Sequence, residues 1–477
     1  MEQTNQPRPN ILLIVSEDTG QDLSCYGDTN VPTPHLDSLA RDGVLFENAY
    51  ITQSVCSPSR STIFTGLYPH QNGQIGLATH AYTMFRRFPT TYSILQEAGY
   101  ATGLIGKTHV NPASVVEDYV DYRAIEGANF AKQNLGEYAD HAATFIESAG
   151  DSPFFLTVNL PDTHWPFQDQ VDGRPENPVG PGDVTVMPYI GMTNQRIQEY
   201  AASYYNCVQR LDGCVGELLE ALAHSGRAEN TLVIFIGDHG AQMARGKIWP
   251  LEAGVKIPLM VRWPGVAGQG RRCDELVSTI DFLPTFLEVA GLPPNDELPG
   301  CSLVPLLEGD SCGFRDYLAV ERNSDVAFLH FPQRAIRDRR YKLIWSPVRD
   351  RPDPGVECYL GQARPPYCGC PSTEELRDAP ERVQQVYATW LNPPEFQLYD
   401  LVADPWEFEN LAGKVELSEV EERLKNALRE WMTQTDDWIA EPEKLSRLTA
   451  ENDAVPPPGH GSPEGGWQYP SYLSGTW

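Results

Sequence analysis

The feature that most constrains this chain is a series of short, continuously apolar runs separated by amphipathic segments. The runs have the length of strands and are apolar throughout, as expected for parallel strands buried on both faces. This alternation predicts an α/β fold with a large mixed, mostly parallel sheet flanked by helices. The expected strands span residues 11–17, 101–105, 154–160, 232–237 and 257–263, and the expected helices span 34–41, 92–98, 137–148 and 197–224.

The pattern changes near residue 316. A proline-rich segment at 293–300 precedes the change. Short expected strands and one long helix follow it, which predicts a smaller α+β domain with an antiparallel sheet. We therefore expect an α/β domain at 1–315, an antiparallel α+β subdomain at 316–454 and an extended Pro/Gly-rich tail at 455–477. The expected elements of the subdomain are strands at 317–321, 341–345 and 397–401 and a helix at 418–435.

The 477-residue chain is strongly acidic, with 36 Lys and Arg against 65 Asp and Glu. This balance argues against nucleic acid as a partner. No run of 18 apolar residues is present, so we expect no membrane span. The first residues are polar and lack the apolar core of a signal peptide. We expect a cytoplasmic protein as written, or a periplasmic or secreted one whose signal was removed.

Ten cysteines are scattered without a regular framework. Cys358, Cys368 and Cys370 cluster loosely in a loop rich in Pro and Gly. A zinc site there lacks an obvious fourth ligand. A disulfide is expected if the protein is secreted, and free thiols if it is not.

Cys56 stands at the start of an expected helix. A β-type run at 43–52 leads into Cys56-Ser57-Pro58-Ser59-Arg60, and a helical run at 57–65 ends before Gly66, a suitable C-cap. Free backbone N–H groups at a helix N-terminus favour negative charge. Arg60 lies one turn on and faces the same side. The segment predicts an anion site with a reactive sulfur at its centre, the alternative being a small core cysteine.

Two acidic pairs end expected strands. Glu17-Asp18 follows the first strand, and Asp238-His239 follows the strand at 232–237. Carboxylates placed together at buried strand ends are costly unless a positive charge lies between them. Hard oxygen ligands favour a hard divalent cation. The alternative is that these side chains only fix the loops that follow the strands.

Basic side chains follow other expected strands. Lys107 and His109 come after the strand at 101–105, and His164 comes after the strand at 154–160. Lys247 lies in the loop that follows Asp238, with Arg245 as a rival two residues before it. Without further context such residues are often only solvated loop ends. Together they predict a cationic site at the carboxyl edge of the sheet, where ligands of such sheets gather.

The block from residue 54 to residue 66 resembles the type I sulfatases of the alkaline-phosphatase-like superfamily. In that family the cysteine of Cys-x-Pro-x-Arg is oxidised to formylglycine, whose hydrate is the nucleophile. The resemblance implies a cation bound by Glu17, Asp18, Asp238, His239 and the modified Cys56. Glu17 and His239 stand where the family has Asp and Asn. We expect Ca²⁺, with Mg²⁺ or Mn²⁺ as alternatives because a histidine nitrogen is a softer ligand.

The resemblance also implies roles for the basic residues. Arg60, Lys107 and Lys247 offset the negative charge of a sulfate and hold its oxygens. His164 protonates the departing oxygen or nitrogen. His109 takes the proton from the second hydroxyl of the hydrate, which expels sulfate and restores the aldehyde.

Further segments resemble the heparan N-sulfatases within this family: 56–60, 69–73 and 105–109. The expected reaction is hydrolysis of a sulfate ester or sulfamate on a carbohydrate. A phosphonate or phosphate-diester hydrolase is an alternative, because Asp-His-Gly also occurs in such relatives. A non-catalytic protein that binds sulfated glycans is another. The expected partners are a sulfated saccharide and a formylglycine-generating or anaerobic sulfatase-maturing enzyme.

Overall fold

The computed structural model describes residues 8–310, 313–349, 351–361 and 369–455. Their central element is an eight-stranded sheet in the order β4-β3-β5-β1-β6-β7-β2-β8. The neighbours from β4 to β6 are parallel, which confirms the predicted α/β fold with a mostly parallel sheet. The strands are β1 (Asn10–Ser16), β2 (Val44–Tyr50), β3 (Ala101–Gly106), β4 (Tyr122–Ala124), β5 (Phe154–Leu160), β6 (Thr231–Gly237), β7 (Lys256–Arg262) and β8 (Arg271–Ser278).

One predicted strand runs in the opposite direction from that expected. The run at 257–263 forms β7, which pairs antiparallel with both β6 and β2. The segment between β6 and β7 holds a loop and the four-residue helix α8 (Glu252–Val255) instead of a long crossover helix. Without a crossover, the chain returns beside β6 in the reverse direction. Because β7 is buried on both faces, it is as apolar as its parallel neighbours, and its sequence did not indicate that it runs antiparallel to them.

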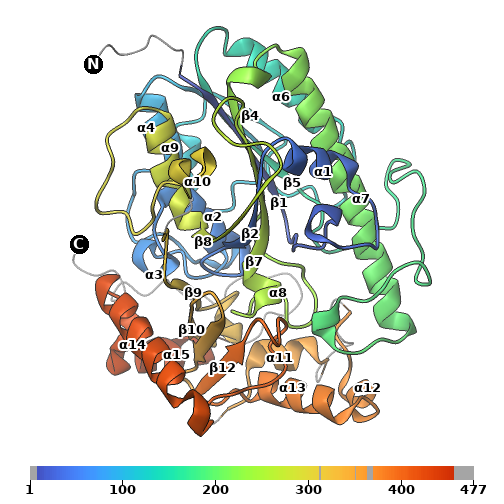
Figure 1. The fold of residues 1–477 in the computed structure, drawn as a ribbon, viewed down its shortest axis with the longest axis vertical. Helices are drawn as coiled ribbons and strands as arrows, with labels where there is room; N and C mark the ends of the chain where they lie inside the picture. Colours follow the sequence, from blue (N-terminus) through green and yellow to red (C-terminus); the bar gives the residue numbers. More distant parts are fainter. Residues whose placement is uncertain (1–7, 311–312, 350, 362–368, 456–477) are drawn as a thin grey trace.

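Helices cover the sheet from two sides (Figure 1). One group contains α1, α6 and α7, in which α7 contacts both α1 and α6, and α6 also contacts β3 and β5. The other contains α2, α4, α9 and α10. The helices of this part of the chain are α1 (Pro34–Arg41), α2 (Cys56–Thr65), α3 (Pro69–Asn72), α4 (Thr91–Glu97), α5 (Ser114–Glu117), α6 (Glu137–Ser148), α7 (Gln195–His224), α9 (Phe282–Val289) and α10 (Val304–Glu308).

A second, antiparallel sheet follows in the order β12-β11-β10-β9, as predicted for the C-terminal part. Figure 1 shows it below the central sheet, with α14 and α15 at one end and α11 to α13 at the other. Its elements are β9 (Leu318–Arg322), β10 (Gln333–Arg337), β11 (Tyr341–Trp345), β12 (Phe396–Asp400), α11 (Pro354–Tyr359), α12 (Thr373–Arg377), α13 (Glu381–Leu391), α14 (Ser418–Gln434) and α15 (Pro442–Asp453).

The two sheets share hydrophobic cores. Val320 and Ile344 of the second sheet belong to the same buried cluster as the central strands. A second buried cluster joins Tyr68 and Ile75 to Leu398 and α14. None of the described helices combines the length and apolarity needed to cross a lipid bilayer.

Two expectations fall largely outside the described residues. The predicted tail lies there from residue 456 on, and so does Cys368 of the loose cysteine cluster. The zinc, disulfide and free-thiol alternatives at that cluster therefore stay predictions.

Candidate active site

Four parallel strands, β3, β5, β1 and β6, end at the same edge of the central sheet and deliver the predicted side chains there. Gly106 ends β3 with φ 90°, and a Cβ at this position would lie 2.5 Å from the carbonyl oxygen of Asn159. Only glycine fits there, so it fixes how the chain turns into Lys107. Asp18 and His109 adopt left-handed conformations with φ 54° and 53°, a strained geometry that is common at functional sites.

Helix α2 places Cys56 at this edge. Cys56 is the first helical residue, and Gly66 ends the helix in the left-handed conformation, as predicted. The Ser59 hydroxyl donates to the carbonyl oxygen of Asp238 at 2.6 Å, which ties the first turn of α2 to the end of β6. The whole helix is buried, so its N-terminus faces the strand ends rather than solvent.

Two carboxylates, an imidazole and the Cys56 sulfur converge on one point. His239 Nε2 lies 3.2 Å from Cys56 Sγ and 3.3 Å from an oxygen of Asp18. Asp238 Oδ1 lies 3.6 Å from the same nitrogen and accepts from the backbone N–H of Asp18 at 2.9 Å. All four side chains are buried. Of the predicted metal ligands, these four form the compact set.

The donor set fits a divalent cation. His239 Nδ1 lies 2.9 Å from the carbonyl oxygen of Gly240, so an N–H there would leave Nε2 to bind a cation once that nitrogen has lost its proton. Burial raises the pKa of Asp238, and the nearby charges of Cys56 and Glu17 raise it further against the effect of His239. Burial lowers the pKa of His239, but Asp238 and Asp18 outweigh it and raise the value to about 9. Both shifts indicate concentrated negative charge, which a cation would neutralise.

Glu17 lies beside this group and faces the basic residues. Its carboxylate accepts from Lys107 Nζ at 2.8 Å and lies 3.6 Å from Arg60. Burial alone raises the pKa of Glu17, but Lys107 and Arg60 lower it to about 2. Arg60 also donates to Asp238 at 3.1 Å and to Asn159 Oδ1 at 2.5 Å. The role of Glu17 as a metal ligand stays a prediction.

Lys247 and its rival Arg245 point in different directions. Lys247 Nζ donates to both oxygens of Asp18 at 3.2 and 3.1 Å and lines the same cavity as Cys56. Arg245 donates to the carbonyl oxygens of Tyr189, Trp406 and Glu407 and stacks 4.7 Å from the Phe408 ring. Lys247, and not Arg245, therefore lines the cavity that contains Cys56.

The two remaining histidines flank Cys56. The ligand atoms of His164, Cys56 and Asp18 lie within 4.8 Å of one another. His109 Nδ1 is buried without a hydrogen-bond partner among the described residues. Burial and the Lys107 ammonium lower the pKa of His109 to about 4, against the effect of Cys56. His109 is therefore neutral near pH 7 and able to accept a proton.

Cys56 itself lies in a strongly positive environment. Burial raises the pKa of its thiol, but Lys107, Lys247 and His239 outweigh burial and bring the pKa well below its usual range. Negative charge at this position is therefore stabilised.

Two residues of the site, Asn159 and Asp325, were not predicted from the sequence. Asn159, which accepts a hydrogen bond from Arg60, is a single amide in the otherwise mostly apolar β5. A polar residue in such a strand could have indicated a role at the site. Asp325 lines the cavity of about 670 Å³ that contains Cys56, Lys107, His109, His164 and Lys247. It comes from the C-terminal part of the chain, so its sequence position gave no signal.

The family model named Sulfatase matches residues 9–292. The chain belongs to the sulfatase family. A second model, for the C-terminal region of N-sulphoglucosamine sulphohydrolase, matches residues 237–349. These matches confirm the predicted family and enzyme class, a sulfuric ester hydrolase.

Two curated sulfatase-family relatives cover most of this chain. Human N-sulphoglucosamine sulphohydrolase is 30% identical over an alignment of 485 positions, gaps included, which covers 92% of this chain and 94% of that protein. An ulvan-active sulfatase of Formosa agariphila is 29% identical over 439 residues, which span 91% and 82%.

Solved structures share the sulfatase fold. One, from a study of glycosaminoglycan metabolism by Bacteroides thetaiotaomicron, has a TM-score of 0.72 at 21% identity and covers 92% of this chain and 99% of that chain. Another, in complex with its substrate D-glucosamine-2-N, 6-O-disulfate, has a TM-score of 0.66 at 21% identity and covers 90% and 98%. These likenesses confirm the predicted alkaline-phosphatase-like fold.

Proposed function

We propose that this sulfatase hydrolyses a sulfate ester or sulfamate on a carbohydrate and releases inorganic sulfate. The observation that carries the proposal is the set of cations around Cys56. Lys107 and Lys247 are buried, share one cavity with Cys56 and are the two strongest charges that lower its pKa. On a molecule of net charge −29, this is a local concentration of positive charge that favours a small anion.

The basic residues act on the sulfate group and on protons. Lys107 and Lys247 bind sulfate oxygens and stabilise the charge that develops on them, because preformed cations in a water-poor site act strongly. Arg60 holds Asp238 and the backbone of Lys107 in place through its hydrogen bonds. His164 is the partly exposed histidine beside Cys56 and donates a proton to the departing atom. His109, neutral near pH 7, accepts a proton.

Two groups complete this site in our proposal. Oxidation of Cys56 to formylglycine would supply an attacking oxygen and a second hydroxyl for release of sulfate. A divalent cation, Ca²⁺ or alternatively Mg²⁺ or Mn²⁺, would be held by Asp18, Asp238, His239 and residue 56, with Glu17 as a further candidate. When bound, this cation polarises oxygen and offsets the charge of the reacting groups.

The relatives support a saccharide substrate. One curated relative is named for N-sulphoglucosamine, others for ulvan, and one solved structure contains a disulfated glucosamine. We propose a sulfated glycosaminoglycan or algal saccharide as substrate. A maturing enzyme that oxidises Cys56 is the partner that this proposal requires.

A panel of defined sulfated saccharides tests the proposal. It includes N-sulfated glucosamine and 2-O-, 4-O- and 6-O-sulfated monosaccharides, with released sulfate measured by ion chromatography. Paired aryl sulfate and aryl phosphonate esters are assayed beside them. We expect sulfate release from at least one saccharide and a kcat/KM for the aryl sulfate above that for the phosphonate. The reverse preference on the aryl pair would favour the phosphonate hydrolase instead.

A further inference from the structure

The segment after strand β9 of the C-terminal sheet lines the cavity around Cys56, and its charged residue there is Asp325. Strand β9 ends at Arg322, and Asp325, three residues further on, lies at the wall of that cavity. The backbone N–H of Leu77 donates to the carbonyl oxygen of Asp325 at 3.0 Å. The backbone N–H of Ala78 donates to the Ser57 hydroxyl at 2.9 Å. The position of Asp325 is thereby connected to the helix that bears Cys56.

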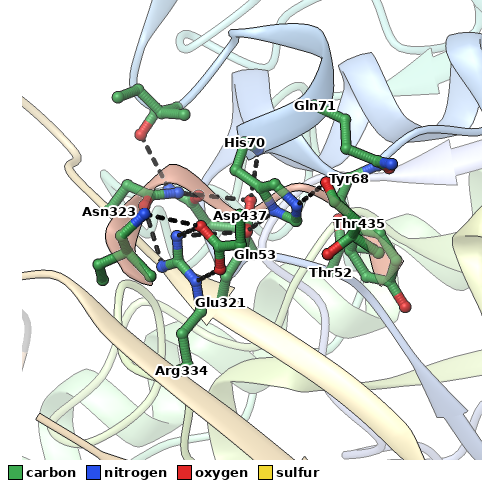
Figure 2. Close-up of polar contacts among 12 residues, drawn as sticks. Thr52, Gln53, Tyr68, His70, Gln71, Glu321, Asn323, Arg334, Thr435 and Asp437 are labelled. Atoms are coloured by element: carbon green, nitrogen blue, oxygen red, sulfur yellow. Dashed lines mark hydrogen bonds and ion pairs between the residues drawn. The ribbon is translucent and has the colours of Figure 1, made fainter. Parts of the chain in front are cut away.

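Buried side chains hold this segment in place (Figure 2). Gln53, three residues before Cys56, donates to the carbonyl oxygens of Ile75 and Ser324 at 3.1 Å each. Asn323 donates to Gln53 Oε1 at 2.9 Å, and the backbone N–H of Glu321 donates to the carbonyl oxygen of Thr52 at 2.7 Å. Such satisfied buried networks fix one geometry. The backbone beside Asp325 is therefore tied by hydrogen bonds to the segment that precedes Cys56.

The carboxylate of Asp325 has unused hydrogen-bonding capacity. Its Oδ1 atom is fully buried and has no partner among the described residues. Burial raises its pKa, and the nearby Lys247 ammonium opposes this rise. Glu117 also lines the cavity, but it pairs with Arg123 at 2.6 Å. A buried acceptor without a donor is costly, and a bound ligand that brings donors removes that cost.

We propose that Asp325 is a specificity-determining residue that accepts hydrogen bonds from hydroxyl groups of the sugar ring carrying the sulfate. This inference rests on the proposed function. A carboxylate offers only acceptors, whereas the sulfate needs donors, so Asp325 does not serve the sulfate itself. Neutral ring hydroxyls are the donors that a sulfated sugar brings within reach. The same negative charge repels a second sulfate or a carboxylate at that place, which selects the substrate by charge as well as by hydrogen bonding.

Binding to an inactive enzyme tests this role without turnover. Isothermal titration calorimetry measures the Kd of two ligands for the Cys56→Ala protein and for the same protein with the additional substitution Asp325→Asn. One is the monosaccharide that releases most sulfate in the panel, and the other is 4-nitrophenyl sulfate, which has no ring hydroxyls. We expect the substitution to weaken saccharide binding roughly 10- to 100-fold, the scale of a charge-assisted hydrogen bond. We expect the Kd for 4-nitrophenyl sulfate to change less than about threefold.

Two controls complete the design. Asp296→Asn removes an exposed carboxylate away from the cavity and leaves both affinities unchanged. Deoxy analogues of the saccharide, each lacking one ring hydroxyl, identify the bonded group, because the effect of Asp325→Asn vanishes for that analogue. Equal weakening for both ligands, or none for either, would overturn the inference. Failure of the proposed function shows separately, as absence of sulfate release by the converted wild-type enzyme.

Discussion

Lys247 and Arg245 are two residues apart in one loop and have different tasks. Lys247 reaches Asp18 and the cavity of the site, whereas Arg245 satisfies three backbone carbonyl oxygens in the interior. We predict that Lys247→Ala lowers kcat/KM about 10²-fold, the usual scale for one lost electrostatic contact to a transition state. Steady-state sulfate release measures this effect.

Arg245→Ala is the matched variant of this pair. It leaves buried carbonyl oxygens without donors, and we predict a loss of about 3 kcal/mol of unfolding free energy. The kcat/KM of the folded fraction changes less than about threefold. Chemical denaturation measures the first quantity. A stable Arg245→Ala protein with the activity loss expected of Lys247→Ala would reverse the two assignments.

Whether a residue could be predicted to lie at the site depended on how close in sequence its partners are. Cys56 and Arg60 lie on one helix. The pairs Glu17-Asp18 and Asp238-His239 follow strands that end at one edge of the sheet. Local pattern and sheet geometry were therefore enough to predict that these residues lie together. Arg245 and Lys247 were indistinguishable, because their directions depend on the fold of the loop. Asp325 was missed because it reaches the site only through the packing of a second sheet, more than 260 residues after Cys56 in sequence.

At the scale of elements, apolar runs predicted where strands lie better than how they are oriented. The run that forms β7 is buried on both faces, like its neighbours, so its apolar pattern does not distinguish a parallel from an antiparallel strand. Only the short connection from β6, which lacks a crossover helix, sets the antiparallel course. Of the four C-terminal strands, β9, β11 and β12 were predicted from the sequence, whereas β10 (Gln333–Arg337) was missed.

A buried charge cluster joins α3 to the C-terminal sheet (Figure 2). His70 Nδ1 lies 2.5 Å from Glu321, and Arg334 pairs with Asp437 at 2.5 Å and lies 3.7 Å from Glu321. Burial lowers the pKa of His70, but Asp437 and Glu321 outweigh burial and Arg334, and the pKa is raised. Protonated His70 and Arg334 then balance two carboxylates. Although His70, Glu321 and Asp437 are spaced for a metal, Arg334 already supplies the positive charge.

This cluster predicts a pH-dependent stability. A histidine whose pKa is raised in the folded state stabilises the protein fully below its unfolded pKa of about 6.5 and loses this effect as pH rises through the folded pKa. The difference in unfolding free energy between wild type and His70→Gln should therefore be constant in acid and shrink above about pH 6.5. Urea denaturation from pH 5 to 9 measures it.

A difference that grows with pH for His70→Gln would mean that His70 is neutral in the folded protein.

At the scale of the whole molecule, a net charge of −29 surrounds a small positive site. Long-range repulsion acts on a polyanionic substrate and is screened by salt, because the Debye length falls from about 30 Å at 0.01 M to about 8 Å at 0.15 M. We predict that the ratio of kcat/KM for a multiply sulfated oligosaccharide to that for a singly sulfated monosaccharide rises a few-fold over this range. Initial rates at both ionic strengths test this, and a falling ratio would indicate an extended positive binding surface.

The predicted division at residue 315 stays a proposal at this scale. The antiparallel sheet is a distinct layer, as the change in sequence pattern indicated. The shared hydrophobic clusters and the placement of Asp325 tie it to the site. These contacts join residues far apart in sequence, so they could not be predicted from local sequence patterns.

We propose that residue 56, once oxidised, is the reacting group inside the cationic site. The most direct measurement uses protein preparations that differ in the fraction of chains whose Cys56 has been oxidised to formylglycine. In each preparation, the rate of sulfate release is compared with that fraction. Peptide mass spectrometry gives that fraction from a mass about 18 Da lower than that of the thiol. We predict that kcat per chain is proportional to the converted fraction and that Cys56→Ala, although folded, is inactive. Full activity in unconverted protein or in Cys56→Ala would contradict the account.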